Sequence, residues 1–93
     1  MHGFDWNEGN KEKSWEKHRV SVKECEEAFF NHPIIIYKDI RHSFDEERYV
    51  VLGRTNVGRK LHIAFTIRDK KIRVISARDQ IKKERKFYES KSQ

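Results

Sequence analysis

The stretch Leu61-His62-Ile63-Ala64-Phe65-Thr66-Ile67 decides the fold, because large apolar residues alternate in it with smaller or more polar ones. A period of two is typical of a β-strand with one buried face. The odd-numbered apolar side chains then share the core face, and the even-numbered side chains share the opposite face. We therefore expect a strand over residues 60–67 that presents one face to the core.

Three further extended segments accompany this strand. Residues 49–54 and 71–77 form two more strands, and residues 34–37 form a short strand followed by a polar loop that includes Ser43 and Asp45. Asn56 and Gly58 supply turn chemistry before residue 60, and Asp69-Lys70 supplies it after residue 67. The sequence therefore predicts an antiparallel meander of four strands, or of five if residues 3–5 also pair.

Capping residues mark two helices before the first strand. Asn7 can cap a helix that runs to about His18, and Ser21 followed by Glu24 is a capping box that opens a second helix. Cys25 lies on the apolar stripe of the second helix, where the expected role is that of a small buried side chain. We expect both helices to pack on the core face of the sheet.

The chain ends in a third helix. Asp79 can cap it, and Tyr88 lies on it at helical spacing from Ile81 and Glu84. We expect the polar tail at residues 90–93 to fray. Residues 1–93 therefore form one α+β domain with two N-terminal helices, a meander sheet and one C-terminal helix.

Composition limits the classes of protein. The 93 residues, 35% of them hydrophobic and 39% charged, suffice for one small domain with a single core. The longest apolar run, residues 34–37, is too short to span a bilayer, and the acidic start does not resemble a signal peptide. A single cysteine, Cys25, fits a reducing compartment. We expect a cytoplasmic protein without a membrane partner.

Charge is divided unevenly along the chain. Residues 1–53 hold 8 basic and 11 acidic side chains, whereas residues 54–93 hold 13 basic and 4 acidic ones. A concentration of positive charge attracts phosphate backbones, because binding releases condensed counterions. The second half is therefore the candidate anion-binding half. The alternatives are that the lysines only solubilise the domain or meet an acidic protein.

The motifs argue against two kinds of chemistry. Five histidines, His2, His18, His32, His42 and His62, are scattered without a helical pair or a cysteine pair beside them, so no metal site is expected. The sequence also lacks a Gly-x-Ser-x-Gly elbow and a glycine-rich phosphate loop. We expect no cofactor.

Charged and aromatic residues at the ends of the expected elements suit a different reaction. RNA cleavage without a metal needs a base for the 2′-hydroxyl, cations for the crowded phosphate and an acid for the leaving oxygen. The candidates are Lys17, His18, Glu47, Arg48, Arg68, Arg78 and Tyr88. The alternative is that the basic residues are solvated surface and that Tyr88 packs rather than stacking on a base.

Two ordered motifs carry a resemblance to a known family. Trp15-Glu16-Lys17-His18 with Val20-Ser21 resembles the N-terminal Lys-His-x-Val-Ser signature of the BrnT toxins of bacterial type II toxin–antitoxin systems. Arg73-Val74-Ile75-Ser76-Ala77-Arg78 is similar to the later signature of the same family. The similarity covers roughly residues 4–89, with further matches at Phe4-Asp5-Trp6, Glu47-Arg48, Leu52-Gly53, Gly58-Arg59 and Glu84-Arg85.

This resemblance implies a RelE-like fold, RNA cleavage that arrests translation and growth, and neutralisation by a BrnA-like antitoxin. Such an antitoxin carries a DNA-binding domain, so operator DNA is reached only through it. Two positions depart from the family pattern, because Arg19 stands where glycine is common and Ser14 where asparagine is common. Glycine would favour a left-handed helix end, whereas Arg19 adds a phosphate-binding charge.

The expected site has a catalytic part and a binding part. Arg48 and Arg78 would meet at one edge of the sheet and fork the scissile phosphate, and Lys17, His18 or Glu47 would act as the base. Tyr88 would stack on a base or donate to the phosphate. RNA-binding charges are expected from Arg19, Arg54, Arg59, Arg68, Arg73 and Arg85. The alternative function is an inactive module of the same fold that binds RNA or an antitoxin, and a basic adaptor is a third.

Overall fold

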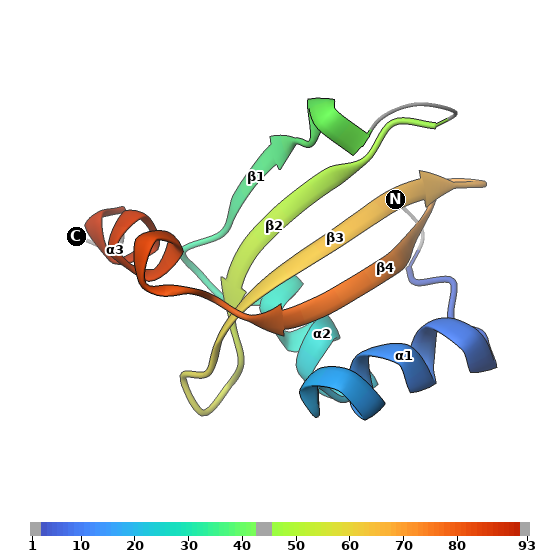
Figure 1. The fold of residues 1–93 in the computed structure, drawn as a ribbon, viewed down its shortest axis with the longest axis horizontal. Coiled ribbons are helices and arrows are strands. Elements are labelled where there is room, and N and C mark those ends of the chain that lie inside the picture. The colour runs from blue at the N-terminus through green and yellow to red at the C-terminus, as the bar shows by residue number, and fades with distance from the viewer. Residues whose placement is uncertain (1–2, 43–45, 92–93) are drawn as a thin grey trace.

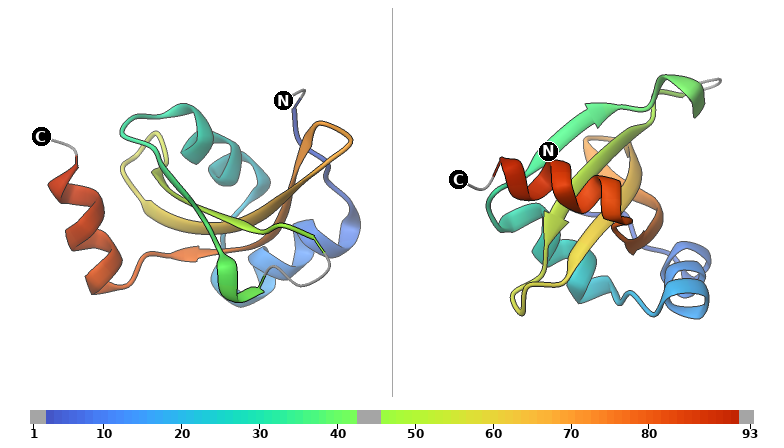
Figure 2. Two further views of the ribbon diagram at one scale, coloured as in Figure 1. Left: turned by 90° about the horizontal axis from the view of Figure 1, so that it is seen from above. Right: turned by 60° about the vertical axis from the view of Figure 1, so that its left-hand side comes forward.

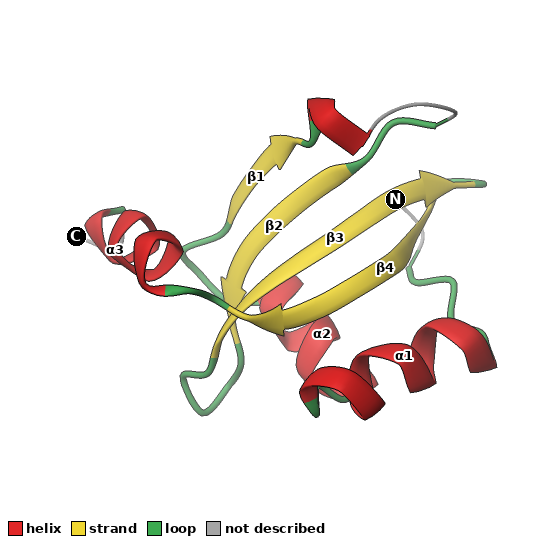
Figure 3. Ribbon diagram, viewed as in Figure 1, coloured by secondary structure: helices red, strands yellow, loops and turns green. Residues whose placement is uncertain are grey.

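Four strands form one antiparallel sheet in chain order, β1 (Ile35–Lys38), β2 (Tyr49–Arg54), β3 (Lys60–Arg68) and β4 (Lys71–Asp79). Helices α1 (Glu8–His18) and α2 (Val22–Phe30) precede the sheet, and α3 (Lys82–Ser90) follows it (Figures 1 and 3). A 3₁₀ turn, Ile40–His42, follows β1. This computed structural model describes residues 3–42 and 46–91, so the loop predicted around Ser43 and Asp45 and the last two residues of the predicted tail lie outside it. The predicted α+β meander fold is confirmed.

The segment before α1 pairs with the sheet at one point only. Phe4 forms a parallel bridge with Ile72, in which the Asp5 amide donates to the Ile72 carbonyl at 2.8 Å and the Ile72 amide donates to the Gly3 carbonyl at 2.9 Å. The possible fifth strand is therefore a single parallel bridge on β4, and the sheet has four strands.

Helix α1 covers the outer edge of β4, so the prediction that both N-terminal helices pack on the core face is wrong for α1. Asn7 caps the helix through a reciprocal pair of hydrogen bonds with Asn10. One and two turns along, the Asn10 amide donates to the Val74 carbonyl at 3.3 Å, and the buried Ser14 hydroxyl accepts from the Ala77 amide at 3.0 Å. These side chains satisfy edge groups that a further strand would otherwise bind.

Helix α2 packs on the core face, as predicted. Its Ser21–Glu24 capping box is present, and buried Cys25 and Ala28 lie in one cluster with the core residues of β2, β3 and β4. Gly53 permits this close approach, because a Cβ at that position would lie 2.3 Å from the Ala28 carbonyl oxygen. Burial raises the pKa of the Cys25 thiol to about 12, which keeps it protonated and unreactive.

Helix α3 begins differently from the prediction. Asp79 is the last residue of β4 and does not cap the helix; the N-cap is Ile81, whose amide donates to the Glu84 carboxylate at 2.9 Å. Tyr88 anchors the helix by packing with Val50 and Leu52 in a second core cluster.

Helix α2 covers one face of the sheet, and on the opposite face Tyr88 of α3 covers Val50 and Leu52 of β2. Helix α2 lies on one side, whereas α3 lies beside the ends of β1 and β2 and α1 runs along β4 (Figure 2). We call the side opposite α2 the open face. It carries the even-numbered side chains of β3, from His62 to Arg68, with their partners on β2 and β4.

Candidate functional site

Three charged side chains converge on the open face next to α3, and we call them the histidine cluster. His62 of β3 pairs in register with Arg78 of β4, and Glu84 reaches them from α3. Arg78 binds Glu84 in a bidentate ion pair, with Nη1–Oε1 2.9 Å and Nη2–Oε2 3.0 Å. The His62 Nε2 lies 3.6 Å from Glu84 Oε2, and these two side chains are only 15% and 18% exposed.

The electrostatics of the histidine cluster keep its imidazole neutral. Burial lowers the pKa of His62, and the charge of Arg78 lowers it further, with Glu84 opposing. Burial would raise the pKa of Glu84, but the hydrogen bonds from Arg78 and the Ile81 amide outweigh it, so the pKa is lowered. A neutral imidazole therefore stands beside a guanidinium that a carboxylate holds in place.

Arg78 keeps part of its hydrogen-bonding capacity. Its Nη1 donates to Glu84 and to the Asp79 carbonyl, and its Nη2 donates to Glu84. A guanidinium has five N–H donors. The remaining two have no partner among the described residues, so Arg78 can donate to a bound anion without releasing Glu84.

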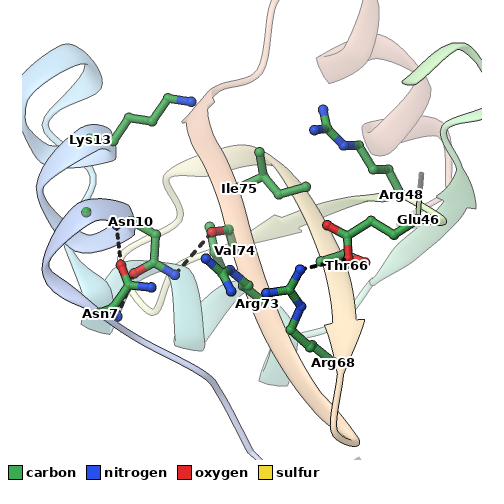
Figure 4. A pocket seen from close by; sticks show the side chains of 11 residues that line it. Asn7, Asn10, Lys13, Glu46, Arg48, Thr66, Arg68, Arg73, Val74 and Ile75 are labelled. Carbon is green, nitrogen blue, oxygen red and sulfur yellow. Dashed lines mark hydrogen bonds and ion pairs between the residues drawn. The ribbon is translucent and has the colours of Figure 1, made fainter. Parts of the chain in front are cut away.

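A second group of charges lies at the other end of the open face, and we call it the arginine hollow. This depression of about 330 Å³ is bordered by Lys13 of α1 and by Arg48, Arg68 and Arg73 of the sheet. Figure 4 shows Lys13 and Arg48 extending on either side of Ile75, and Arg68 reaching Glu46 at 3.4 Å. The Arg73 side chain has no hydrogen bond or ion pair with a described residue, so its charge is available to a ligand.

The predicted meeting of Arg48 with Arg78 is wrong. Strands β2 and β4 are each antiparallel to β3 and therefore parallel to each other, so the start of β2 and the end of β4 lie at opposite ends of the sheet. Arg48 borders the arginine hollow near the Thr66–Arg73 pair, whereas Arg78 pairs with His62. The two pairs are four residues apart on β3, about 13 Å at the rise of a strand.

Two predicted catalytic residues face away from both groups. Glu47 accepts hydrogen bonds from Lys38 at 2.9 Å and from the Tyr49 hydroxyl at 2.8 Å, which lower its pKa. Because the Tyr49 ring stacks on Phe65 of the core face, Glu47 lies on the opposite side of β2 from Arg48. Tyr88 is buried, and its hydroxyl donates to the Pro33 carbonyl at 2.6 Å. It therefore holds α3 in place and is not exposed for stacking on an RNA nucleobase.

Arg59 forms a structural clamp. Its five donors bind both Asp79 oxygens, Glu24 and the carbonyls of His18 and Arg19 at 2.7–3.1 Å. These contacts raise its pKa, with the Asp79 hydrogen bond as the largest cause. Arg59 joins the end of α1 to α2 and β4 and keeps no donor for RNA.

The remaining predicted residues lie at the margins. Lys17 and His18 are exposed at the end of α1, with Lys17 one turn after Lys13 on the same side of the helix. Arg19 is the left-handed C-cap, with φ 54°, and stacks on Trp15. Arg54 donates to the His32 carbonyl and Arg85 to the Gln80 carbonyl.

The candidate site residues predicted from the sequence did not include His62, Glu84 or Lys13, although the structure places His62 and Glu84 beside Arg78 and Lys13 beside the arginine hollow. The alternation in residues 61–67 places His62 on the face opposite the core, and this was the sequence feature that could have identified it as a candidate. Its pairing with Arg78 depends on a bulge in β4 between the partners of Ala64 and Phe65.

The described residues contain no group of three or more His, Cys, Asp or Glu side chains that could hold a metal ion. Within the same part of the chain, no helix is both long and apolar enough to cross a membrane.

Comparison with known proteins identifies the family. A family model described as "Ribonuclease toxin, BrnT, of type II toxin-antitoxin system" matches residues 6–84, which include the arginine hollow, His62, Arg78 and Glu84. A search of curated protein sequences returned no match. The chain therefore belongs to the BrnT family of ribonuclease toxins of type II toxin–antitoxin systems.

Proposed function

We propose that the protein cleaves RNA without a metal ion, on the open face, with the histidine cluster at the scissile phosphate. The family supplies the class of activity and implies an antitoxin partner. The observation that carries the proposal is the neutral His62 beside an Arg78 with two unused donors. Cleavage of cytoplasmic RNA would then arrest translation and growth, and a BrnA-like antitoxin would link the toxin to operator DNA.

The chemistry follows from these two side chains. His62 accepts the proton of the 2′-hydroxyl, whose oxygen attacks the adjacent phosphorus and forms a 2′,3′-cyclic phosphate. The bond to the 5′-oxygen breaks, and that oxygen takes a proton from the solvent, with Lys17 and His18 at the end of α1 as candidate donors. Arg78 donates to the phosphate oxygens as their charge increases.

Glu84 acts as a positioning residue for Arg78. Its bidentate contact fixes the plane of the guanidinium, and its own orientation is fixed by the Ile81 amide. A preoriented donor costs little reorganisation when charge develops, which is the main source of electrostatic catalysis.

The arginine hollow binds the neighbouring part of the strand. Lys13, Arg68 and Arg73 place several positive charges about 13 Å from His62 along the sheet. RNA that spans the open face therefore contacts both groups, and the hollow contributes affinity rather than chemistry.

The experiment compares cleavage of a short RNA by matched variants in the presence of EDTA. We expect His62→Ala and Arg78→Ala to lower kcat by about 10²–10³-fold. Arg73→Ala should instead raise KM, and Lys23→Ala, which removes an exposed charge on α2, should change neither parameter. Parental kcat in folded His62→Ala would refute the assignment, and loss of all activity in EDTA would refute metal independence.

The pH profile gives a second readout. Because His62 must be neutral to accept the proton and its pKa is lowered, kcat should rise with pH through that lowered pKa and be level at neutral pH. This acid limb should disappear from the residual activity of His62→Ala.

A further inference from the structure

An apolar groove of about 590 Å³ separates α3 from the open-face side chains of β1 and β2. Its apolar lining consists of Ile35, Tyr37, Leu52, Ile81 and Phe87. Tyr37, Ile81 and Phe87 are 43%, 54% and 48% exposed. Large apolar side chains gathered in this way on a highly charged domain are typical of a docking surface. We call this surface the α3 groove.

Two charged residues line the α3 groove, Lys83 and Glu84, and Arg78 holds the carboxylate of Glu84 in an ion pair. Helix α3 carries four basic and two acidic residues, and both acids are engaged, Glu84 by Arg78 and Glu89 by Lys60. Lys83 lines the groove and has no ion-pair partner among the described residues. The groove therefore combines an apolar floor with uncompensated positive charge, which complements an acidic amphipathic segment.

The α3 groove adjoins the histidine cluster. Glu84 lines the groove and at the same time binds Arg78. Burial raises the pKa of the Tyr37 hydroxyl, Glu84 adds to this rise and Arg78 opposes it, so the hydroxyl lies within electrostatic reach of both. A chain seated in the groove therefore stands over the end of the open face where RNA would bind.

We propose that the antitoxin binds in the α3 groove through an amphipathic helix with an apolar ridge and an acidic flank. This inference rests on the proposed function for its effect on RNA, but the binding itself does not depend on it. A trough between a helix and a sheet accepts a helix whose anchors recur at three and four residues. The step from Ile81 to Phe87 spans about 9 Å, which two turns of the partner helix fill.

Calorimetric titration of the purified toxin with its purified cognate antitoxin, without RNA, tests the groove. Phe87→Ser removes an apolar wall, and Lys83→Glu reverses a charge that lines the groove. Val57→Ser is the control, because Val57 is 90% exposed in the turn between β2 and β3. We expect Kd to rise at least tenfold in the first two variants and to be unchanged in the control, and stopped-flow mixing should show slower association for Lys83→Glu.

Other occupants give different results. A partner that adds a strand to the free edge of β1 would bind Phe87→Ser and Lys83→Glu with parental affinity, and this result overturns the proposal. A toxin dimer that Phe87→Ser dissociates in sedimentation experiments would show a second copy in the groove and would also overturn it. Thermal melting checks that each variant is folded. If Phe87→Ser does not fold, Lys83→Glu, which changes an exposed side chain, still tests the proposal.

RNA cleavage by the same variants separates this inference from the proposed function. Phe87→Ser and Lys83→Glu should cleave RNA at the parental rate and resist inhibition by the antitoxin. If the parental toxin failed to cleave RNA, the proposed function would be wrong while the affinities would still decide the location of the antitoxin.

Discussion

Arg59, Arg78 and Arg73 differ in how many of their N–H donors the fold uses, and this number determines whether each can still bind a ligand. All five N–H groups of Arg59 bind described residues, those of Arg78 are partly used, and the Arg73 side chain binds none of them. A phosphate can be bound only by donors that folding has left open. Residue type alone therefore does not identify the arginines that contact RNA.

Arg59→Ala should cost about 2–3 kcal/mol of unfolding free energy, because Glu24, Asp79 and two helix-end carbonyls lose charged hydrogen bonds together. Urea unfolding measures the loss. Arg68→Ala, which removes one exposed contact to Glu46 at 3.4 Å, should change stability by no more than about 0.5 kcal/mol. Equal losses in the two variants would contradict the clamp.

Arg59 also makes the free energy of unfolding depend on pH in the acidic range. Its hydrogen bond is the largest cause of the lowered pKa of Asp79, and it lowers that of Glu24 against the effect of burial. Carboxyls with lowered pKa stabilise the fold above their unfolded pKa and lose this contribution as pH falls through the folded pKa. The fall in stability from pH 5 to pH 2 should therefore be shallower in Arg59→Ala.

At the scale of elements, the sequence predicted every helix and strand but not which side chains meet on the sheet. The Asp69-Lys70 turn pairs Arg68 with Lys71, and a regular hairpin would continue to a His62–Ala77 pair. The bulge adds one residue to β4, so His62 instead meets Arg78 on the open face. No turn or capping residue marks this bulge, and the histidine cluster therefore could not be read from spacing.

The prediction that Asp79 caps α3 was wrong for a related reason. Asp79 is a good N-cap residue, but it occupies the end of β4, where Arg59 from the turn between β2 and β3 binds both of its oxygens. Here an ion pair between residues distant in sequence outweighs the local capping preference of aspartate. Capping propensity describes only contacts between neighbouring residues, so it could not predict this outcome.

Ser14→Ala tests how α1 holds β4. The change leaves the buried Ala77 amide without an acceptor and should cost about 1–2 kcal/mol. Hydrogen exchange of the Ala77 amide should accelerate, because its partner is lost. Glu12→Ala on the exposed side of α1 is the control and should change stability by less than about 0.5 kcal/mol. Unchanged exchange at Ala77 in Ser14→Ala would show that this bond does not hold the edge.

At the scale of the molecule, basic residues from both halves of the sequence meet on one surface, because Lys13 and Arg48 border the arginine hollow together with Arg68 and Arg73. Residues 54–93 build β3 and β4, which border the arginine hollow, and α3, which borders the α3 groove. Anion binding by the second half of the chain stays a prediction. The net charge of that half does not separate the cations that folding leaves open from those that, like Arg59, bind groups within the fold.

The salt dependence of RNA binding should reveal this separation. With a 2′-O-methyl RNA that cannot be cleaved, log K should fall linearly with log salt, by about 0.7 for each phosphate neutralised. Arg73→Ala should reduce the slope by about 0.7. Arg59→Ala removes the same charge from the clamp and should leave the slope unchanged in fluorescence anisotropy titrations. Equal effects of both changes would show that only net charge matters.

The position of α1 links the dose of toxin in a cell to the quality of its folding. The same helix seals the rim of β4 through Asn10 and Ser14 and supplies Lys13 to the arginine hollow. A molecule in which α1 has detached would lose an RNA-binding wall and would expose a strand able to recruit other chains. Heat or cleavage of the N-terminal segment would thus inactivate the toxin and promote its aggregation together, so that only intact molecules could harm their host.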